Sequence, residues 1–304
     1  MSPGGWQWEP LGRLAVADGR HRWCHSHLGA ATTLPPAGDR VTVLVTGRDA
    51  DNRSMIGRGE LDLSTDTPTL DLAPEPLLEP GSLGTFDENG VSYPCAVAHG
   101  SEVWCYYTGW MPTVLTPFQN HIGLARLGDG RLERISRAPV LPRTDDDHLS
   151  MGSCFVLREQ PDRWRMWYTS FTSWGTGPSH RYLIKYAESA DGLDWRRDGH
   201  VAIGPADADE HSISRPTVVR DEAGHHMWFC VRGDDYRIGY AWSADGIDWE
   251  RDDGAAGIGP GTGDWDDRAQ AYPHVFRAAG SLWMLYAGND YGADGIGIAR
   301  GRSA

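Results

Sequence analysis

Acidic residues gather in short polar segments, each of which precedes an apolar, strand-like segment of the chain. Asp87, Glu210 and Asp267 stand in three such segments. Where a fold brings carboxylates together, crowding raises the pKa of one and leaves another ionised, which suits general acid and base catalysis. Glycoside hydrolysis uses such a pair. We therefore predict catalytic roles for these three acids; the alternative for each is a solvated or turn-capping carboxylate.

Arginine and histidine side chains accompany these acids. Arg215 precedes a proline in a strand-like segment, and Arg232 ends the next one. An arginine at a pocket could bind a carboxylate or phosphate bidentately, or form a structural ion pair with Glu210 or Asp234. Histidines could act as acid or base, hydrogen-bond sugar hydroxyls, or be structural. The predicted ligand-binding residues are His25, His27, Arg48, Asp49, Trp110, His148, Trp174, Arg215, Arg232 and Tyr272.

Tryptophan is abundant, with 14 residues in the chain. Several occupy repeated positions typical of a core, whereas Trp110, Trp174 and Trp265 fall in irregular segments. An aromatic face can stack on the C–H face of a sugar ring. These three residues are therefore candidates for the wall of a carbohydrate site, and loop packing is the alternative.

An internal repeat predicts the elements that position these residues. The segment Ser189–Trp195 is nearly repeated by Ser243–Trp249, and three strand-like phrases recur five times along the chain. Repeats of 40 to 60 residues built from short strands are typical of propeller blades. We predict an all-β, five-bladed β-propeller that forms one domain over residues 1–304. Its blades are expected at roughly 20–80, 81–142, 143–205, 206–260 and 261–304, with an additional N-terminal segment.

The propeller model sorts the loops between two ends of a central channel. Segments before the first strand of each blade and connections from second to third strand should meet at one mouth. The Asp-Gly hairpins after the third strands should lie at the opposite end as structural turns. Their acids are therefore not candidates for chemistry: Asp191, Asp194, Asp245 and Asp248.

Composition excludes several classes of partner. The formal net charge of -14 argues against nucleic acid and against an anionic membrane surface. No apolar run is long enough to span a bilayer, and the first residues lack the features of a secretory signal. The five cysteines are scattered without metal-ligand spacing. We expect a cytoplasmic protein with no metal, no cofactor, and a small-molecule or carbohydrate ligand.

The strand phrases also carry a family resemblance. Phe86–Val91 leading to Tyr93-Pro94, the aromatic second strands, and the Tyr-Ala-x-Ser-x-Asp-Gly-x-x-Trp pattern resemble the five-bladed propellers of the arabinanase, invertase and levansucrase-like superfamily (glycoside hydrolase families 43, 32, 68 and relatives). The resemblance implies a blade-one Asp as base or nucleophile, a blade-two Asp that tunes it, and a blade-three Glu as acid.

This chain departs from that family pattern in two of the three places. Asp87 falls near the blade-two position, but His25 and His27 stand where the blade-one Asp is expected. Blade three offers Asp147 and His148 instead of Glu, and the Glu-Asp-Pro-Arg phrase of the mannoside phosphorylases is absent. The resemblance therefore implies a divergent member with a rebuilt or lost acid/base set.

Two classes of function follow. The first is a glycoside-hydrolase-like enzyme that uses carboxylate chemistry on a small sugar or glycosylated intermediate inside the cell, for instance in polysaccharide or natural-product biosynthesis. A non-hydrolytic lyase or cyclase on the same scaffold is a variant of it. The second is a non-catalytic carbohydrate-binding or protein-interaction propeller.

Overall fold

The computed structural model describes residues 5–35, 38–175, 180–261 and 263–303. Nearly every regular element is an antiparallel β-strand, because short β-branched and aromatic segments alternate with Gly-, Asp- and Asn-rich turns. The exceptions are a short 3₁₀ helix, η1 (Asp253–Ala256), and a single turn, α1 (Asn289–Gly292).

Antiparallel pairings divide the strands into five consecutive groups, which we call blades 1 to 5; single parallel bridges join blade 1 to blade 2 and blade 3 to blade 4. Blade 1 contains β2 (Leu28–Thr33), β3 (Arg40–Arg48), β4 (Ser54–Asp62) and β5 (Thr69–Leu72). Blade 2 contains β6 (Gly90–His99), β7 (Glu102–Pro112), β8 (Phe118–Leu127) and β9 (Leu132–Arg134). Blade 3 contains β10 (Met151–Gln160), β11 (Arg163–Ser173), β12 (Arg181–Ser189), β13 (Trp195–Arg196) and β14 (Val201–Ile203).

The remaining strands form the last two blades. Blade 4 contains β15 (Ser212–Asp221), β16 (Gly224–Arg232), β17 (Tyr236–Ser243) and β18 (Glu250–Arg251). Blade 5 contains β19 (Ala271–Ala278), β20 (Ser281–Ala287), β21 (Ile296–Ser303) and the N-terminal strand β1 (Trp6–Ala15).

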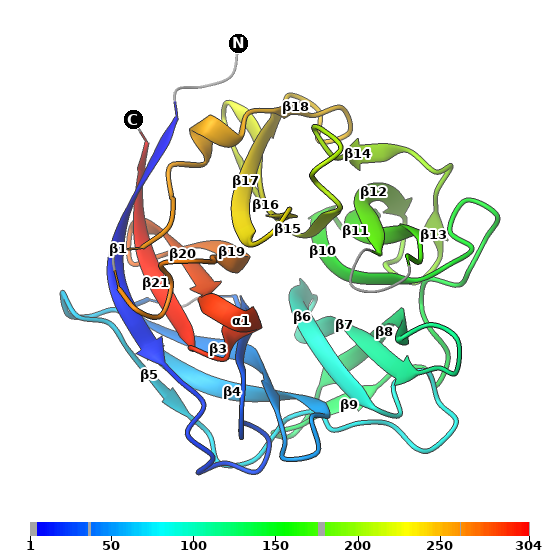
Figure 1. Ribbon diagram of the computed structural model, residues 1–304, viewed down its shortest axis with the longest axis horizontal. Helices are drawn as coiled ribbons and strands as arrows, with labels where there is room; N and C mark the ends of the chain where they lie inside the picture. Colours follow the sequence, from blue (N-terminus) through cyan, green and yellow to red (C-terminus); the bar gives the residue numbers. More distant parts are fainter. Residues whose placement is uncertain (1–4, 36–37, 176–179, 262, 304) are drawn as a thin grey trace.

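The first strands of the blades surround a central axis (Figure 1). They contact one another in a closed circuit, from β2 to β6, β10, β15 and β19 and back to β2. Large side chains fill the layers between neighbouring blades, such as Trp23 between blades 1 and 5 and Trp167 between blades 3 and 4. This is a β-propeller, and the predicted fold class is confirmed.

The N-terminal strand closes the ring. β1 pairs antiparallel with β21, so the segment that the repeat left over supplies the outermost strand of blade 5. Trp6 and Trp8 on this strand pack edge-on against Trp228 of blade 4, with ring centroids 5.3 and 5.6 Å away. The two ends of the chain therefore share one sheet (Figure 1).

Each innermost strand contains a β-bulge at the same place. The pairing register shifts there, and one residue other than glycine has a φ between 32° and 57°. A side chain in this region is strained, and bulges often re-aim a side chain next to a functional site. The five bulge residues are Ala30, Tyr93, Ser153, Arg215 and Tyr272.

The two Asp-Gly hairpins join neighbouring blades. The Asp191 carboxylate accepts hydrogen bonds from the backbone N–H groups of Leu193 and Asp194, at 2.8 and 2.9 Å. Tyr106 of blade 2 donates its hydroxyl to the Gly192 carbonyl at 2.6 Å. Trp167 of blade 3 donates in the same way to Gly246, at 3.0 Å. The hairpins thus have the structural role expected from the repeat.

Replacing Tyr106 with phenylalanine should lower the free energy of unfolding by about 1–2 kcal/mol, because the buried Gly192 carbonyl loses its donor. Chemical denaturation of both proteins measures the difference. Tyr291→Phe is the matched control, since that residue is 43% exposed and its hydroxyl is not enclosed by the core. Equal stability of the two variants would contradict the blade-joining role of Tyr106.

Candidate functional site

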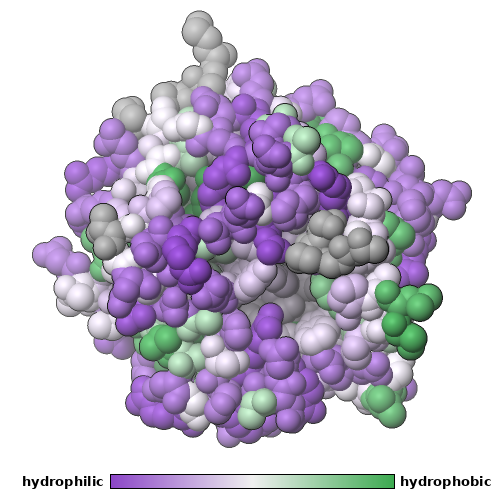
Figure 2. Space-filling model, in the orientation of Figure 1, coloured by the Kyte–Doolittle hydropathy of each residue, from purple (hydrophilic) through white to green (hydrophobic). Residues whose placement is uncertain are grey.

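Two adjoining hollows open where the channel meets one face of the ring. The first, of about 330 Å³, lies against blades 1 and 2, and we call it the blade-1/2 pocket. The second, of about 280 Å³, lies against blades 3 and 4 and is called the blade-3/4 pocket. They form one central cavity, because six residues line both: Arg48, Tyr93, Phe118, Asn120, Tyr272 and Tyr291. Figure 2 shows a depression near the middle of this face, surrounded mainly by hydrophilic residues.

The lining comes from the chain segments that the repeat alignment predicts for the mouth. Arg48 ends β3, and Ser54 begins β4. Trp110 lies near the end of β7, and Phe118 begins β8. Four of the five bulge residues also line the cavity: Ala30, Tyr93, Ser153 and Tyr272.

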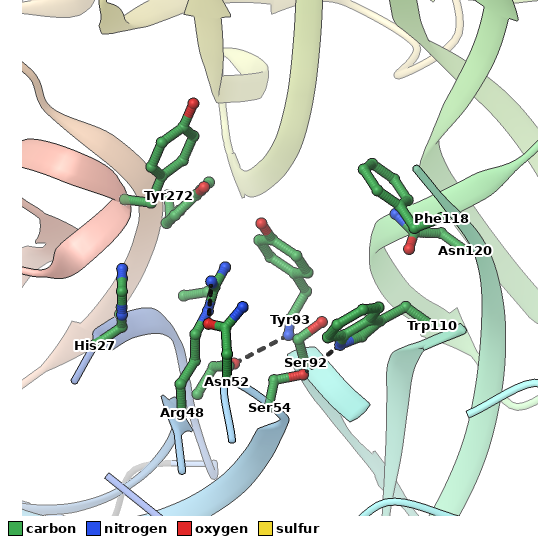
Figure 3. A pocket seen from close by; sticks show the side chains of 14 residues that line it. His27, Arg48, Asn52, Ser54, Ser92, Tyr93, Trp110, Phe118, Asn120 and Tyr272 are labelled. Carbon is green, nitrogen blue, oxygen red and sulfur yellow. Dashed lines mark hydrogen bonds between the residues drawn. The ribbon is translucent and has the colours of Figure 1, made fainter. Parts of the chain in front are cut away.

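Aromatic side chains form one wall of the blade-1/2 pocket (Figure 3). Trp110 and Phe118 lie together on this side. The Trp110 indole N–H donates to Ser54 Oγ at 2.7 Å, which fixes the orientation of the ring. Tyr93 packs edge-on against Tyr272 at 5.2 Å. Rigid aromatic faces with a few polar groups beside them are typical of a small-molecule site.

Cationic and polar side chains occupy the other side. Arg48 donates from Nη1 to Asn52 Oδ1 at 2.8 Å. In the blade-3/4 pocket the Arg232 guanidinium lies 5.4 Å from the Tyr236 ring centre and 5.5 Å from that of Tyr291. Two cation–π contacts hold this guanidinium in place without neutralising it.

Two histidines border these arginines. Burial, reinforced by the charge of Arg48, lowers the pKa of His27. Burial and the charge of Arg232 lower the pKa of His180 in the same way. Both imidazoles are therefore neutral at neutral pH. Among the described residues, neither pocket is lined by a carboxylate.

The structure does not bring Asp87, Glu210 and Asp267 together in the cavity. Asp87 is buried within blade 2, where its Oδ2 accepts from Arg134 Nε at 2.7 Å and from the Tyr107 hydroxyl at 3.0 Å. Asp267 is exposed and accepts from Asn289 Nδ2 at 2.9 Å. Asp87 is thus held in an ion pair with Arg134, and Asp267 lies on the surface.

Glu210 is buried in a cluster with two arginines. Its carboxylate accepts from Arg251 at 2.8 Å, from Arg237, and from the Ala206 N–H at 2.7 Å. Burial raises the pKa of this group, but the hydrogen bonds and the Arg251 charge outweigh burial and lower the pKa to about 2. A carboxyl group of this kind stays ionised at neutral pH.

A repeated contact explains why acids precede the first strands. Asp87, Asp147 and Asp266 each accept a hydrogen bond from a tyrosine on the second strand of their own blade, at 3.0, 2.8 and 3.0 Å. The tyrosines are Tyr107, Tyr168 and Tyr286. These acids fix the start of a blade to its second strand. The paired repeat of acid and tyrosine was the sequence signal for this role.

Half of the predicted ligand-binding residues line the cavity: His27, Arg48, Trp110, Arg232 and Tyr272. His25 and His148 have exposed side chains outside the lining. Asp49 is buried, and it binds the Arg53 side chain and the backbone of its own loop. Trp174 lies behind the lining, stacked on Phe171 at 5.0 Å.

Arg215 lies in the channel beneath the cavity, fully buried. Its Nη2 donates to the carbonyls of Ala31 at 2.6 Å and Pro94 at 3.1 Å, which belong to blades 1 and 2. Burial lowers the pKa of this guanidinium. Within the described part of the chain it forms no ion pair, so it ties blades together rather than pairing with Glu210 or Asp234.

Sequence reasoning did not single out several lining residues. They are Asn52, Tyr93, Phe118, Asn120, His180, Tyr182, Tyr236 and Tyr291. One signal was available, because the residue before proline in Tyr93-Pro94 and Tyr272-Pro273 is the bulge residue in both strands. Phe118, Asn120, Tyr182 and Tyr236 lie at or near the start of third strands, an end that the repeat assigns to the mouth without giving the direction of each side chain.

The described residues contain no group of three or more His, Cys, Asp or Glu side chains arranged for a metal ion. The same part of the chain has no helix with the length and apolar character needed to cross a membrane.

Solved structures share this fold at low sequence identity. A glycoside hydrolase superposes with a TM-score of 0.76 at 16% identity, covering 98% of this chain and 91% of its own. A thermostable family-43 glycoside hydrolase gives 0.67 at 16%, covering 91% and 88%. The β-1,2-mannobiose phosphorylase from Listeria innocua gives 0.70 at 12%, covering 97% and 96%. The resemblance inferred from the strand phrases is confirmed at the level of the fold.

Two proteins have a higher sequence identity to this chain than these solved structures do. No family model matches the chain. Two proteins of Mycobacterium tuberculosis, Rv1502 (strain H37Rv) and MT1551 (strain CDC 1551), are each 38% identical over 296 residues, which cover 96% of this chain and 98% of theirs. The chain therefore belongs to the same protein family as Rv1502 and MT1551.

Proposed function

We propose that the protein binds a carbohydrate, or a glycosylated small molecule, in the central cavity and does not hydrolyse it with a carboxylate pair. One observation carries the proposal. The cavity combines an aromatic wall with hydrogen-bonding amides, hydroxyls and guanidiniums, and its described lining contains no carboxylate.

The aromatic wall suits a sugar ring. Trp110 is held by Ser54, and Phe118 lies beside it, so the wall loses little conformational freedom when a ligand binds. Asn52, Asn120 and Ser92 supply donors and acceptors for hydroxyl groups. The fold neighbours include a phosphorylase solved with β-1,2-mannobiose, which supports a carbohydrate ligand on this scaffold.

The buried acids do not suit glycoside hydrolysis. A catalytic acid needs a raised pKa so that it is protonated before it donates to the leaving group. The pKa of Glu210 is instead lowered to about 2. Asp87 is bound to Arg134 and Tyr107, away from both pockets.

A non-hydrolytic lyase or cyclase is the second candidate, supported by His27. Its imidazole lies in the blade-1/2 pocket, its pKa is lowered, and its Nδ1 is 2.9 Å from Ser26 Oγ. A neutral imidazole can act as a general base without a carboxylate. Cytoplasmic location and a role in biosynthesis remain predictions.

Binding of a panel of mono- and disaccharides by isothermal titration calorimetry tests the proposal. Trp110→Ala should weaken binding at least about tenfold, because the stacking face is lost. Trp242→Ala, on the outer part of blade 4, is the matched control and should bind as the wild type does. Failure of every sugar, neutral or anionic, to bind would refute a carbohydrate site.

A hydrolysis assay separates this proposal from the carboxylate enzyme. We expect no release of reducing sugar or aryl leaving group from any glycoside. Hydrolysis that Asp87→Asn abolishes, in a variant that still folds and binds ligand, would show that the acid pair is catalytic after all.

A further inference from the structure

The central cavity holds two arginines and no described carboxylate, although the chain has 42 acidic against 28 basic residues. Most other buried or half-buried arginines pair with an acid. Arg134 binds Asp87, Arg197 binds Asp147 and Arg251 binds Glu210. Among the described residues, Arg48 and Arg232 have no such partner.

Both unpaired guanidiniums are nevertheless held in place. Asn52 accepts from Arg48, and the rings of Tyr236 and Tyr291 flank Arg232. Asp290, the acid next to Tyr291, is bound by Arg268 at 2.8 Å. A cation that is oriented but not neutralised is ready to accept an anion, because little ordering cost remains when the anion binds.

We propose that the bound carbohydrate carries an anionic group, a phosphate or a carboxylate, which binds between Arg48 and Arg232. This inference rests on the proposed function and names its ligand class. Arg48 lines both pockets, and Arg232 lines the blade-3/4 pocket. A sugar ring on Trp110 in the blade-1/2 pocket would thus direct its anionic substituent toward the tyrosine-flanked arginine.

The net negative charge of the protein gives the two unpaired arginines a specific importance for binding an anion. A net charge of -14 repels anions at long range. An anionic ligand therefore needs a nearby cation that no protein acid neutralises. Neutral His27 and His180 beside the arginines add hydrogen-bonding groups but no positive charge, so the guanidiniums of Arg48 and Arg232 remain the cations of the described lining.

Titration calorimetry with matched sugars tests the inference. The probes are glucose, glucose 1-phosphate, glucose 6-phosphate and glucuronate, the same set based on mannose and galactose, and inorganic phosphate. At least one anionic sugar should bind about 10- to 100-fold more tightly than its neutral parent. A phosphate preference and a uronate preference both support the site and identify the source of the anion.

Arg232→Gln and Arg48→Gln should each remove most of that preference while affinity for the neutral sugar stays within about twofold. Arg232→Lys should retain part of it, because the charge remains but the planar fork is lost. Arg302→Gln, at a side chain 70% exposed on the outer strand, is the matched control and should not alter binding. Circular dichroism shows whether each variant is folded.

The failures of the two proposals are distinguishable. If neutral sugars bind and Trp110→Ala weakens them, but no anionic sugar binds more tightly, the anion site is refuted and the carbohydrate site stands. If Arg232→Gln weakens neutral and anionic sugars equally, the arginine has no specific role toward an anion. If no sugar of either kind binds, the proposed function itself fails.

Discussion

Replacing Asp147 with alanine is expected to lower the free energy of unfolding by about 3–5 kcal/mol. This is a large part of the roughly 5–15 kcal/mol by which a typical domain is stable. The carboxylate is completely buried and lies 3.1 Å from Lys185 Nζ and 2.8 Å from Arg197 Nε. It also accepts from Tyr168 and Ser170, at 2.8 and 2.6 Å. Alanine would leave two buried cations without a counter-charge, and chemical denaturation measures the loss.

The neighbouring acid provides the control for this experiment. Asp146 is exposed, and it contacts Lys185 only through its backbone carbonyl, which alanine retains. Asp146→Ala should therefore change stability by less than about 0.5 kcal/mol. A small effect of Asp147→Ala, similar to that of Asp146→Ala, would show that water or a shifted side chain compensates the cluster.

The second large effect is a dependence of stability on pH that originates at Glu210. The pKa of this carboxyl is about 2 in the folded protein, against 4.5 for an unperturbed glutamate. A lowered folded pKa stabilises the protein fully above pH 4.5, and the contribution, roughly 3 kcal/mol, is lost as the pH falls from about 5 toward 2. Glu210→Gln should remove this contribution at pH 7 and flatten the acid limb of the stability curve.

Urea denaturation of wild type and Glu210→Gln at several pH values between 7 and 3 measures the effect. The difference in free energy should be largest at pH 7 and shrink steadily below pH 4.5. Glu222→Gln, at an exposed acid, serves as the control for loss of one negative charge. A gap between wild type and Glu210→Gln that is independent of pH would assign the destabilisation to lost packing instead.

The fold could be predicted from the sequence because its signal is repeated. One strand phrase is ambiguous, but five aligned copies constrain the same architecture. The repeat set the N-terminal segment apart without giving it a partner, since it has no copy elsewhere in the chain and pairs with β21 only through closure. A segment that pairs across the whole chain leaves no local pattern to recognise.

The candidate site could be predicted in part. Trp110, Arg48 and Arg232 lie at strand ends that the repeat assigns to the mouth, and the structure places them there. The roles of the acids could not be predicted in this way. The repeat shows at which end of a blade an acid lies, but not the direction of its side chain. Asp87 starts its blade as expected, yet it turns toward Tyr107 of its own blade rather than toward the cavity.

Because β1 pairs with β21, the ring cannot close until the last strand of the chain has been synthesised. Glu9 emerges early, but its partner Arg300 lies 291 residues further along the chain. Until β21 has been made, β1 is an unpaired strand and blade 5 offers an open edge. Such edges are sites of association between incomplete chains. An incomplete chain is therefore expected to expose the edge of β1 until β21 is available to pair with it.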